Sequence, residues 1–147
     1  MLAMSTQNYA NHRQIVPAFH YVLLPVLALT LIGSVVNLIK SLGDHERLYS
    51  ASLIAVLSAA MLLLALMARL SALKAQDRAI RAEENLRHFV LTGKLLDPRL
   101  EVRQIIALRF AGDNEFQDLS RRAADEKLTG DAIKRAVKNW RADTYRV

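Results

Sequence analysis

The 147-residue chain contains no cysteine. This absence excludes disulfide bonds, thiolate metal sites and a cysteine nucleophile, and it leaves the redox compartment undetermined. The chain also contains only 5 glycines and 3 prolines. A sequence with so few glycines does not favour the glycine-rich loops that bind phosphate groups. The P-loop, dinucleotide-binding and nucleophile-elbow patterns do not occur in it. We therefore expect a non-enzymatic protein with no catalytic residue, no metal and no cofactor.

Charge is missing from two long stretches of the chain. No Asp, Glu, Lys or Arg occurs from Gln14 to Ile39 or from Leu48 to Ala68. Charged residues gather instead from Arg69 onward, where 17 of the 20 Lys and Arg and 12 of the 14 Asp and Glu are found. This part therefore carries +5 of the formal net charge of +6. A basic balance of this kind favours contact with anionic lipid headgroups or nucleic acid.

The two charge-free stretches predict a transmembrane hairpin over residues 16–68, with spans at about 17–39 and 49–68. A helix needs about 20 apolar residues to cross the hydrocarbon core, and neither stretch has the polar outer face of a soluble helix. The first is too long for the apolar region of a signal peptide and no A-x-A-like site follows it, so we expect an uncleaved anchor. Pro25 should kink this span.

Basic residues predict the orientation of the hairpin. The short connection carries Lys40 and Arg47, whereas the opposite side carries Arg13 and the many basic residues that follow the second span. The side richer in Lys and Arg faces the cytoplasm. We therefore expect a protein of the inner (cytoplasmic) membrane with both termini cytoplasmic, residues 1–15 forming an N-terminal cytoplasmic segment.

Small residues recur at helical spacing within both spans. Ala51, Ala55 and Ala59 repeat every four residues on the second span, and Gly33 and Asn37 do so on the first. Small side chains let helix backbones approach closely, and an Asn can hydrogen-bond between helices. The pattern fits simple packing of the two spans on each other, or a groove for a second copy or another protein.

The second span predicts a juxtamembrane helix over residues 69–93, because no Gly or Pro interrupts the chain before Gly93. Its basic residues satisfy the orientation rule and are also candidates for contact with anionic lipids. These are Arg69, Lys74, Arg78 and Arg81. Leu66, Leu70, Leu73 and Ile80 give a weak coiled-coil signal that Asp77 and Glu84 interrupt, and docking against the C-terminal region explains these residues equally well.

Residues 94–147 predict a small cytoplasmic helical domain, so the fold class is all-α. The first helix should start at Asp97-Pro98 and break at Gly112. Asp113 or Asn114 should cap the second, which places Phe116, Leu119 and Ala123 on one face. After the turn at Thr129-Gly130, the last helix should set Ile133, Val137 and Trp140 on one face.

Two features of the charged region suggest sites, although each has a simpler explanation. Glu84 and His88 lie one helical turn apart, but a single such pair falls short of a metal site. The last two helices loosely echo a helix-turn-helix, a motif whose second helix can enter a DNA groove, except that Arg122 and Glu126 occupy positions that should be apolar. The candidate face for a protein partner or nucleic acid consists of Lys134, Arg135, Lys138 and Arg141.

Segments at both ends of the chain resemble a known family. They are QNYANH at residues 7–12, RQIIALRFA at 103–111 and IKRAVKNWRADTYRV at 133–147. Together they resemble a bacterial family of small two-span membrane proteins, known only as a domain of unknown function. The resemblance implies the two-span topology and assigns no activity.

These observations favour an integral membrane protein that acts as an anchored interaction or accessory protein through its cytoplasmic helical domain. Its expected partners are membrane lipids, together with another protein or further copies of itself. The alternative is a membrane-tethered protein that binds nucleic acid or another anionic ligand.

Overall fold

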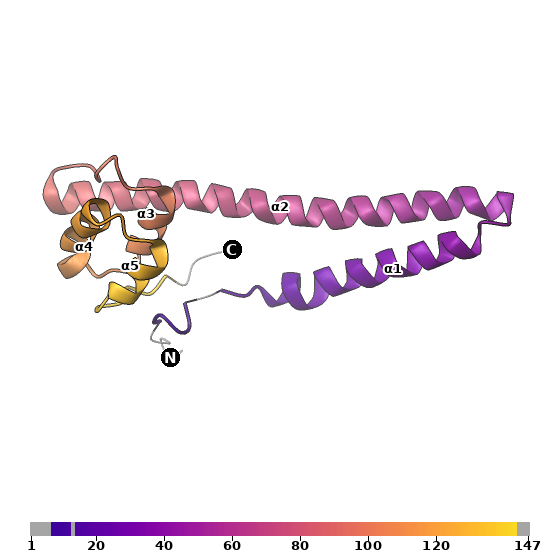
Figure 1. The fold of residues 1–147 in the computed structure, drawn as a ribbon, viewed down its shortest axis with the longest axis horizontal. Coiled ribbons are helices and arrows are strands. Elements are labelled where there is room, and N and C mark those ends of the chain that lie inside the picture. Colours follow the sequence, from indigo (N-terminus) through magenta and orange to yellow (C-terminus); the bar gives the residue numbers. More distant parts are fainter. Residues whose placement is uncertain (1–6, 13, 144–147) are drawn as a thin grey trace. The chain divides into compact units, whose positions relative to one another are not determined.

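The computed structural model describes residues 7–12 and 14–143, among which it contains helices and no strand. The all-α prediction is therefore confirmed for this part of the chain. Arg13 and the two ends of the chain, residues 1–6 and 144–147, lie outside the described residues, so the expectations that fall there stay untested. The elements are η1 (Ala18–Leu23), α1 (Leu24–Lys40), α2 (His45–Thr92), α3 (Val102–Leu108), α4 (Asp113–Asp125) and α5 (Gly130–Ala136), of which the α-helices are labelled in Figure 1.

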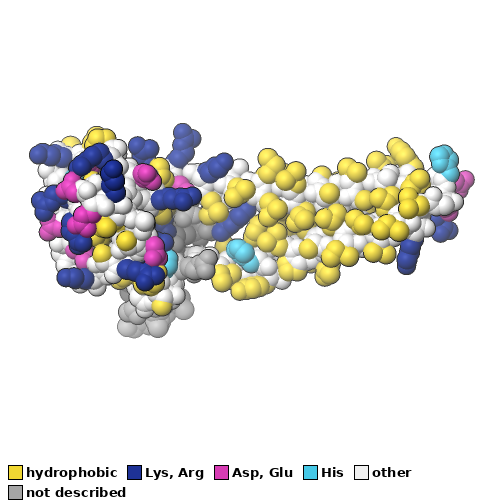
Figure 2. Space-filling view, in the orientation of Figure 1, with side chains coloured by type: hydrophobic (Ala, Val, Ile, Leu, Met, Phe, Trp, Pro, Cys, Tyr) yellow, Lys and Arg dark blue, Asp and Glu magenta, His cyan; other side chains and the backbone are white. Residues whose placement is uncertain are grey.

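The chain divides into two compact units, which are described separately below. One comprises residues 15–72, and the other comprises residues 1–14 together with 73–147. Helix α2 contributes residues to both. Figure 2 shows hydrophobic side chains gathered over α1 and the first part of α2, and charged side chains gathered over the shorter helices.

The first unit is a helical hairpin with a four-residue turn. Helix α1 ends at Lys40 with Ser41 as its C-cap, while Gly43 lies within the turn. The amide of Asp44 donates to the Ser41 carbonyl (3.0 Å), and the Asp44 carboxylate accepts from the amides of Glu46 and Arg47 (both 3.2 Å). An Asp at this place satisfies amides that the first turn of a helix leaves without partners.

The inner face of the hairpin is lined by small side chains. Ser34, Ala51 and Ser58 are buried, and Ala55 is half-buried. The hydroxyls of Ser34 and Ser58 donate to carbonyls of their own helices, Leu31 O and Ile54 O, both at 2.8 Å. Burying these serines therefore leaves no hydroxyl unsatisfied, and their size lets the two backbones approach.

Pro25 lies where the π-helical η1 gives way to α1. A proline ring crowds the carbonyl four residues earlier and supplies no N–H, and a wider π-turn is one way in which a helix accommodates such a defect. The helix type therefore changes next to Pro25, and the kink itself stays a prediction.

The second unit is a small helical domain. Helix α2 continues without a break to Thr92, as predicted, and ends at Gly93, whose φ of 73° is left-handed. Its amide donates to the Phe89 carbonyl (2.7 Å), an arrangement that favours glycine. The core of the domain consists of Leu96, Leu100, Ile105, Ala107, Leu108, Ala111, Phe116, Leu119, Ala123, Ala124, Ile133 and Val137.

Two predicted helix starts are wrong. Asp97-Pro98 forms a turn closed by the Leu100 amide on the Asp97 carbonyl (3.0 Å), and α3 begins only at Val102. There Glu101 and Gln104 form a capping box, in which each side chain accepts the other's backbone N–H. Helix α4 is capped by Gly112 rather than by Asp113 or Asn114.

The predicted last helix is also too long. Helix α5 ends at Ala136, and Trp140 forms an isolated antiparallel bridge with Ala111. Gly112 N donates to Asn139 O and Arg141 N donates to Phe110 O, both at 2.8 Å. A Cβ on Gly112 would lie 3.0 Å from Asn139 O, so any larger residue here would crowd the bridge. Trp140 packs on the core as predicted, but through this bridge.

Lys127 provides a test of the α4 terminus. Its φ of 50° is left-handed, and the next amide, Leu128 N, donates to Ala123 O (3.2 Å), as in a Schellman motif. Because a side chain in this region costs roughly 1 kcal/mol, Lys127→Gly should raise the free energy of unfolding by about that amount. Urea unfolding of the full chain in detergent, followed by the fluorescence of Trp140, measures it. Lys127→Ala, which removes the charge but keeps the strain, should bring no gain, and an equal gain would attribute the effect to charge.

Candidate functional site

A buried ion pair joins α2 to the rest of the helical domain. The Arg87 guanidinium donates to Glu84 Oε2 (2.9 Å), to Asp113 Oδ1 (2.7 Å) and to the carbonyl of Ala111 (2.7 Å). The side chains of Glu84 and Arg87 are 5% and 11% exposed. The guanidinium also lies 4.2 Å from the ring centroid of Phe116, which is a favourable cation–π distance.

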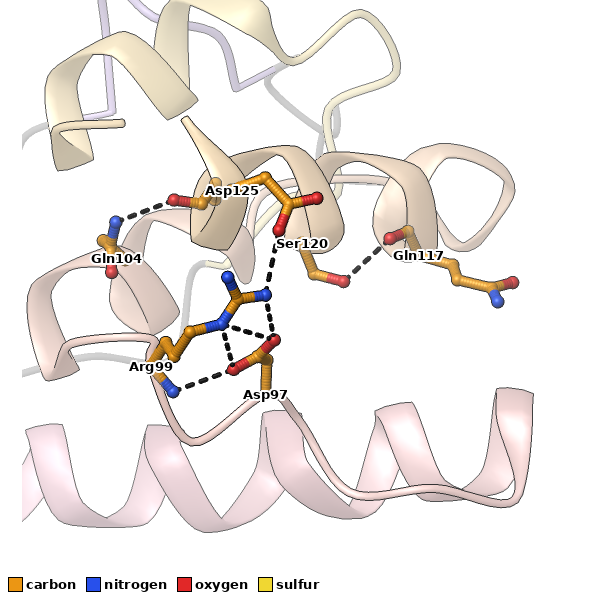
Figure 3. A network of polar contacts seen from close by, with 7 residues as sticks. Asp97, Arg99, Gln104, Gln117, Ser120 and Asp125 are labelled. Carbon is orange, nitrogen blue, oxygen red and sulfur yellow. Dashed lines mark hydrogen bonds and ion pairs between the residues drawn. The ribbon is translucent and has the colours of Figure 1, made fainter. Parts of the chain in front are cut away.

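A second polar network fixes the loop before α3. Arg99 donates to Asp97 Oδ2 (2.6 Å) and to Asp125 Oδ1 (2.9 Å), so it bridges the loop to the C-terminal end of α4 (Figure 3). Buried Gln104 donates to the carbonyls of Ala123 (3.1 Å) and Leu128 (2.8 Å). The hydrogen bonds from Arg99 lower the pKa of the Asp97 carboxyl, so they favour the ionised form of Asp97.

The N-terminal segment packs on α5 and the residues beyond it. The Tyr9 hydroxyl donates to Asp131 Oδ1 (2.6 Å), and Arg135 lies 5.0 Å from the centroid of the Tyr9 ring. His12 Nδ1 donates to the Tyr9 carbonyl (2.6 Å), which leaves His12 Nε2 to face Lys134 Nζ at 3.1 Å. The His12 ring centroid lies 6.0 Å from that of Trp140.

A reciprocal contact extends this packing to the end of the described chain. The Asp143 amide donates to Gln7 Oε1 (2.7 Å), and Gln7 Nε2 donates to the Asp143 carbonyl (3.4 Å). The described parts of two sequence segments, residues 7–12 and 133–143, are therefore in direct contact.

The four basic residues predicted to form one face on the last helix are divided by the structure. Lys134 and Arg135 lie on the seven-residue α5, and Lys138 and Arg141 follow it. Arg135 Nε lies 2.9 Å from Asp131 Oδ2. Arg141 Nη1 lies 3.5 Å from Glu84 Oε1. No continuous recognition helix therefore carries all four.

The candidate lipid contacts lie on α2. Lys74, Arg78 and Arg81 are exposed and are spaced i, i+4, i+7, so they share one flank of the helix. Arg69 lies on a different flank, with its guanidinium 5.7 Å from the centroid of the Phe19 ring. The structure thus groups three of the four residues.

The candidate packing residues of the spans are also divided. Ala51 is 1% exposed and Ala55 is half-buried, whereas Gly33, Asn37 and Ala59 are exposed. The inward-facing residue on α1 is Ser34, one position after Gly33, and a shift of one residue rotates a side chain about 100° around a helix. Gly33, Asn37 and Ala59 therefore remain accessible to another molecule.

Glu84 and His88 do not act as a pair. Glu84 is bound by Arg87, and His88 Nδ1 donates to the carbonyl of Lys94 (2.7 Å). Within residues 7–12 and 14–143, no three His, Asp or Glu side chains are grouped so as to hold a metal ion.

Sequence reasoning missed an apolar surface on the same helix. Ile80 and Glu84 of α2 are buried in the domain, so the predicted docking of Ile80 is correct. The opposite side of the helix carries exposed apolar residues at spacings of four and three, which we term the outer stripe. It consists of Ala75, Ala79, Ala82, Leu86 and Phe89. The seam noted in the sequence, Leu66, Leu70, Leu73 and Ile80, lies on the other side of the helix, where Ile80 is buried and Leu70 is exposed.

Comparison with known families shows that the model of a family of unknown function, DUF6526, matches residues 4–147. Neither the curated proteins nor the solved structures contain a match to this chain.

Truncation of Arg87 tests the buried ion pair. Arg87→Ala leaves Glu84 buried with only the more distant Arg141 near it, so the free energy of unfolding should fall by about 3 kcal/mol. The double substitution Glu84→Leu/Arg87→Met should recover most of that loss, because no buried charge remains. Urea unfolding of the full chain in detergent measures both. Arg121→Ala, at an exposed ion pair on α4, should change stability by less than about 0.5 kcal/mol, and a similar small change for Arg87→Ala would show that Glu84 does not depend on Arg87.

The Tyr9–Asp131 contact predicts a pH dependence. The hydrogen bond raises the pKa of Tyr9 and lowers the pKa of Asp131 below its ordinary value of 3.8. Because the pKa of Asp131 is lowered in the folded chain, the ionised carboxylate stabilises the fold fully above pH 3.8. This contribution is lost as the pH falls through the lowered pKa and the carboxylate is protonated. In an NMR titration, Tyr9→Phe should therefore raise the pKa of Asp131. The pKa of Asp97, which is lowered by Arg99 and not by Tyr9, should not move, and an unchanged Asp131 pKa would show that the contact does not form.

Proposed function

Because this chain belongs to DUF6526, a family of unknown function, we propose its role from its own residues: a non-enzymatic protein anchored in a membrane by its hairpin, acting through its helical domain. Both of its termini face the cytoplasm, and the membrane is the cytoplasmic one. The domain is an interaction module that serves a partner at the membrane surface.

The anchor rests on the low burial of the hairpin. Two helices, Ala18–Lys40 and His45–Thr92, are long and apolar enough to cross a membrane, and only 6% and 11% of their most apolar windows are buried. A core helix of a soluble protein would be mostly covered. The outer surface instead exposes large side chains such as Leu29 (68%), Val56 (67%) and Leu64 (66%). An apolar surface of this extent favours lipid over water.

Length and charge support the topology. The 23 residues of Ala18–Lys40 extend about 34 Å at 1.5 Å per residue, against a hydrocarbon core of about 30 Å. Lys40 and Arg47 flank the turn of the hairpin, whereas residues after the second span include the grouped Lys74, Arg78 and Arg81. The side with more basic residues faces the cytoplasm. The same three residues suit anionic headgroups, at about 1 kcal/mol each near the surface.

The non-enzymatic role is supported by what the charged side chains of the domain do. Glu84 and Arg87 bind each other and the backbone of the domain, and Arg99 joins Asp97 to Asp125. These groups hold the helices in place, as structural ion pairs do. The alternative role, nucleic-acid binding through the last helix, has less support, because Arg135 is paired with Asp131 and α5 has seven residues.

Fractionation and reporter fusions test this proposal. The full chain should sediment with membranes and resist extraction by alkaline carbonate, because its hairpin lies in hydrocarbon. A green fluorescent protein fused after Val147 should fluoresce, whereas alkaline phosphatase should be active only when inserted in the turn at Gly43.

Two controls make the outcome decisive. A chain lacking residues 16–68 should leave the membrane fraction. Moving the basic residues Lys74, Arg78 and Arg81 from the segment after the second span to the turn should reduce the difference in reporter activity between the turn and the C-terminus. Recovery of the full chain in the soluble fraction would refute the anchor. Phosphatase activity at the C-terminus would refute the orientation alone.

A further inference from the structure

We propose that the outer stripe of α2 is a homodimer interface, on which α2 of a second copy packs in parallel as a short coiled coil. The proposal deepens the proposed function and rests on its membrane anchor, because two copies with the same topology present their α2 helices side by side in the same direction.

The stripe has the geometry of a coiled-coil seam. Ala75, Ala79, Ala82, Leu86 and Phe89 follow one another at steps of four and three residues, the spacing of alternating d and a positions in a heptad. Leu86 is 63% exposed and Phe89 50%, with Val90 (74%) at the edge. The stripe extends about 21 Å along the helix.

The remainder of the domain leaves this seam accessible. The buried side chains of α2, Ile80 and Glu84, lie on the face that packs against the domain core. A turn of about 100° per residue places the outer stripe roughly opposite that face. A second helix can therefore pack on the stripe without displacing any core residue, and the alanines at its first three positions allow the backbones a close approach.

Charges beside the seam select a second copy in parallel register. With Ala79 and Leu86 at a positions, Arg78 occupies a g position and Glu83 the following e position. In a parallel coiled coil, a g residue lies beside the e residue five positions later on the other helix. Arg78 of one copy therefore meets Glu83 of the other, and the two-fold symmetry makes this pair twice.

Both charges are available for this pairing. Arg78 and Glu83 are exposed, and no ion pair within the described part of the chain involves either one. They cannot satisfy each other within one helix, where side chains pair at separations of three or four residues. An antiparallel partner would place g beside g and e beside e, which opposes like charges. The pattern therefore favours the parallel dimer.

The anchor also explains how a short seam suffices. Fifteen residues with three alanines form a weak coiled coil in dilute solution, where helices of this length are marginal. Tethering both copies to one membrane raises their effective concentration and removes most of the orientational search. The seam then needs to supply only specificity of register.

Cysteine cross-linking in native membranes tests the interface, and the absence of cysteine from the chain makes each introduced thiol unique. Ala79→Cys, Ala82→Cys, Leu86→Cys and Phe89→Cys should each give an oxidised species of about twice the 16.5 kDa chain mass. Leu91→Cys and Leu95→Cys, at exposed positions off the stripe, are the matched controls and should remain monomeric. Sedimentation with membranes is checked in every sample.

Charge reversal tests the register in the Ala82→Cys background. Arg78→Glu and Glu83→Arg should each lower the cross-linking yield about fivefold, because each opposes like charges at two places. The double substitution recreates both pairs with opposite polarity and should restore the yield. If the cross-links arose from random encounters between chains that form no specific dimer, the double substitution would not restore the yield.

The outcomes separate this proposal from the one on which it rests. Cross-links confined to the stripe, with rescue by the double reversal, support the dimer. Equal cross-linking at control and stripe positions, or none at any position, overturns the dimer while membrane sedimentation leaves the anchor standing. Adducts with a different protein at the stripe overturn the second copy as occupant. A chain found in the soluble fraction refutes the anchor, and this proposal with it.

Discussion

The buried contact between Glu84 and Arg87 is the interaction on which the helical domain depends. A single guanidinium neutralises a carboxylate on its own helix, binds Asp113 at the start of α4, donates to the Ala111 carbonyl and stacks on Phe116. Charges of this kind are costly to bury unless every partner is present. The contact therefore fixes the rotation of α2 about its own axis, and with it the identity of the residues that face outward.

That rotation explains why one helix can carry two unlike faces. Ile80 and Glu84 belong to the domain core, whereas Ala82 and Leu86 belong to the opposite side. The helical period, in turn, brings together charges that are separated in the sequence. Lys74, Arg78 and Arg81 lie together on one flank, where headgroup binding and pairing with a second copy both become physically reasonable. The role proposed for the domain follows from surfaces of α2 rather than from its loops.

The contact between the two ends of the chain is a second organising feature. Gln7, Tyr9 and His12 bind residues of α5 and the segment after it. Residues 7–12 and 133–147 are two of the three segments on which the family resemblance rests, and their described parts are in direct contact. A substitution in one of these segments should therefore disturb the packing of the other, although more than a hundred residues separate them in the sequence.

Local properties of the sequence determined the helices of this protein. A run without charge, or a helix without Gly or Pro until Gly93, is read from neighbouring residues alone, because helical hydrogen bonds join residues four apart. The tertiary structure decided what those neighbours could not. Arg99 joins Asp97 to Asp125 where a helix start was predicted, Trp140 reaches the core through a bridge to Ala111, and Ser34 rather than Gly33 faces α2. Each of these depends on a partner distant in the chain or on a rotation of about 100° between adjacent residues, and neither is encoded within a single helical turn.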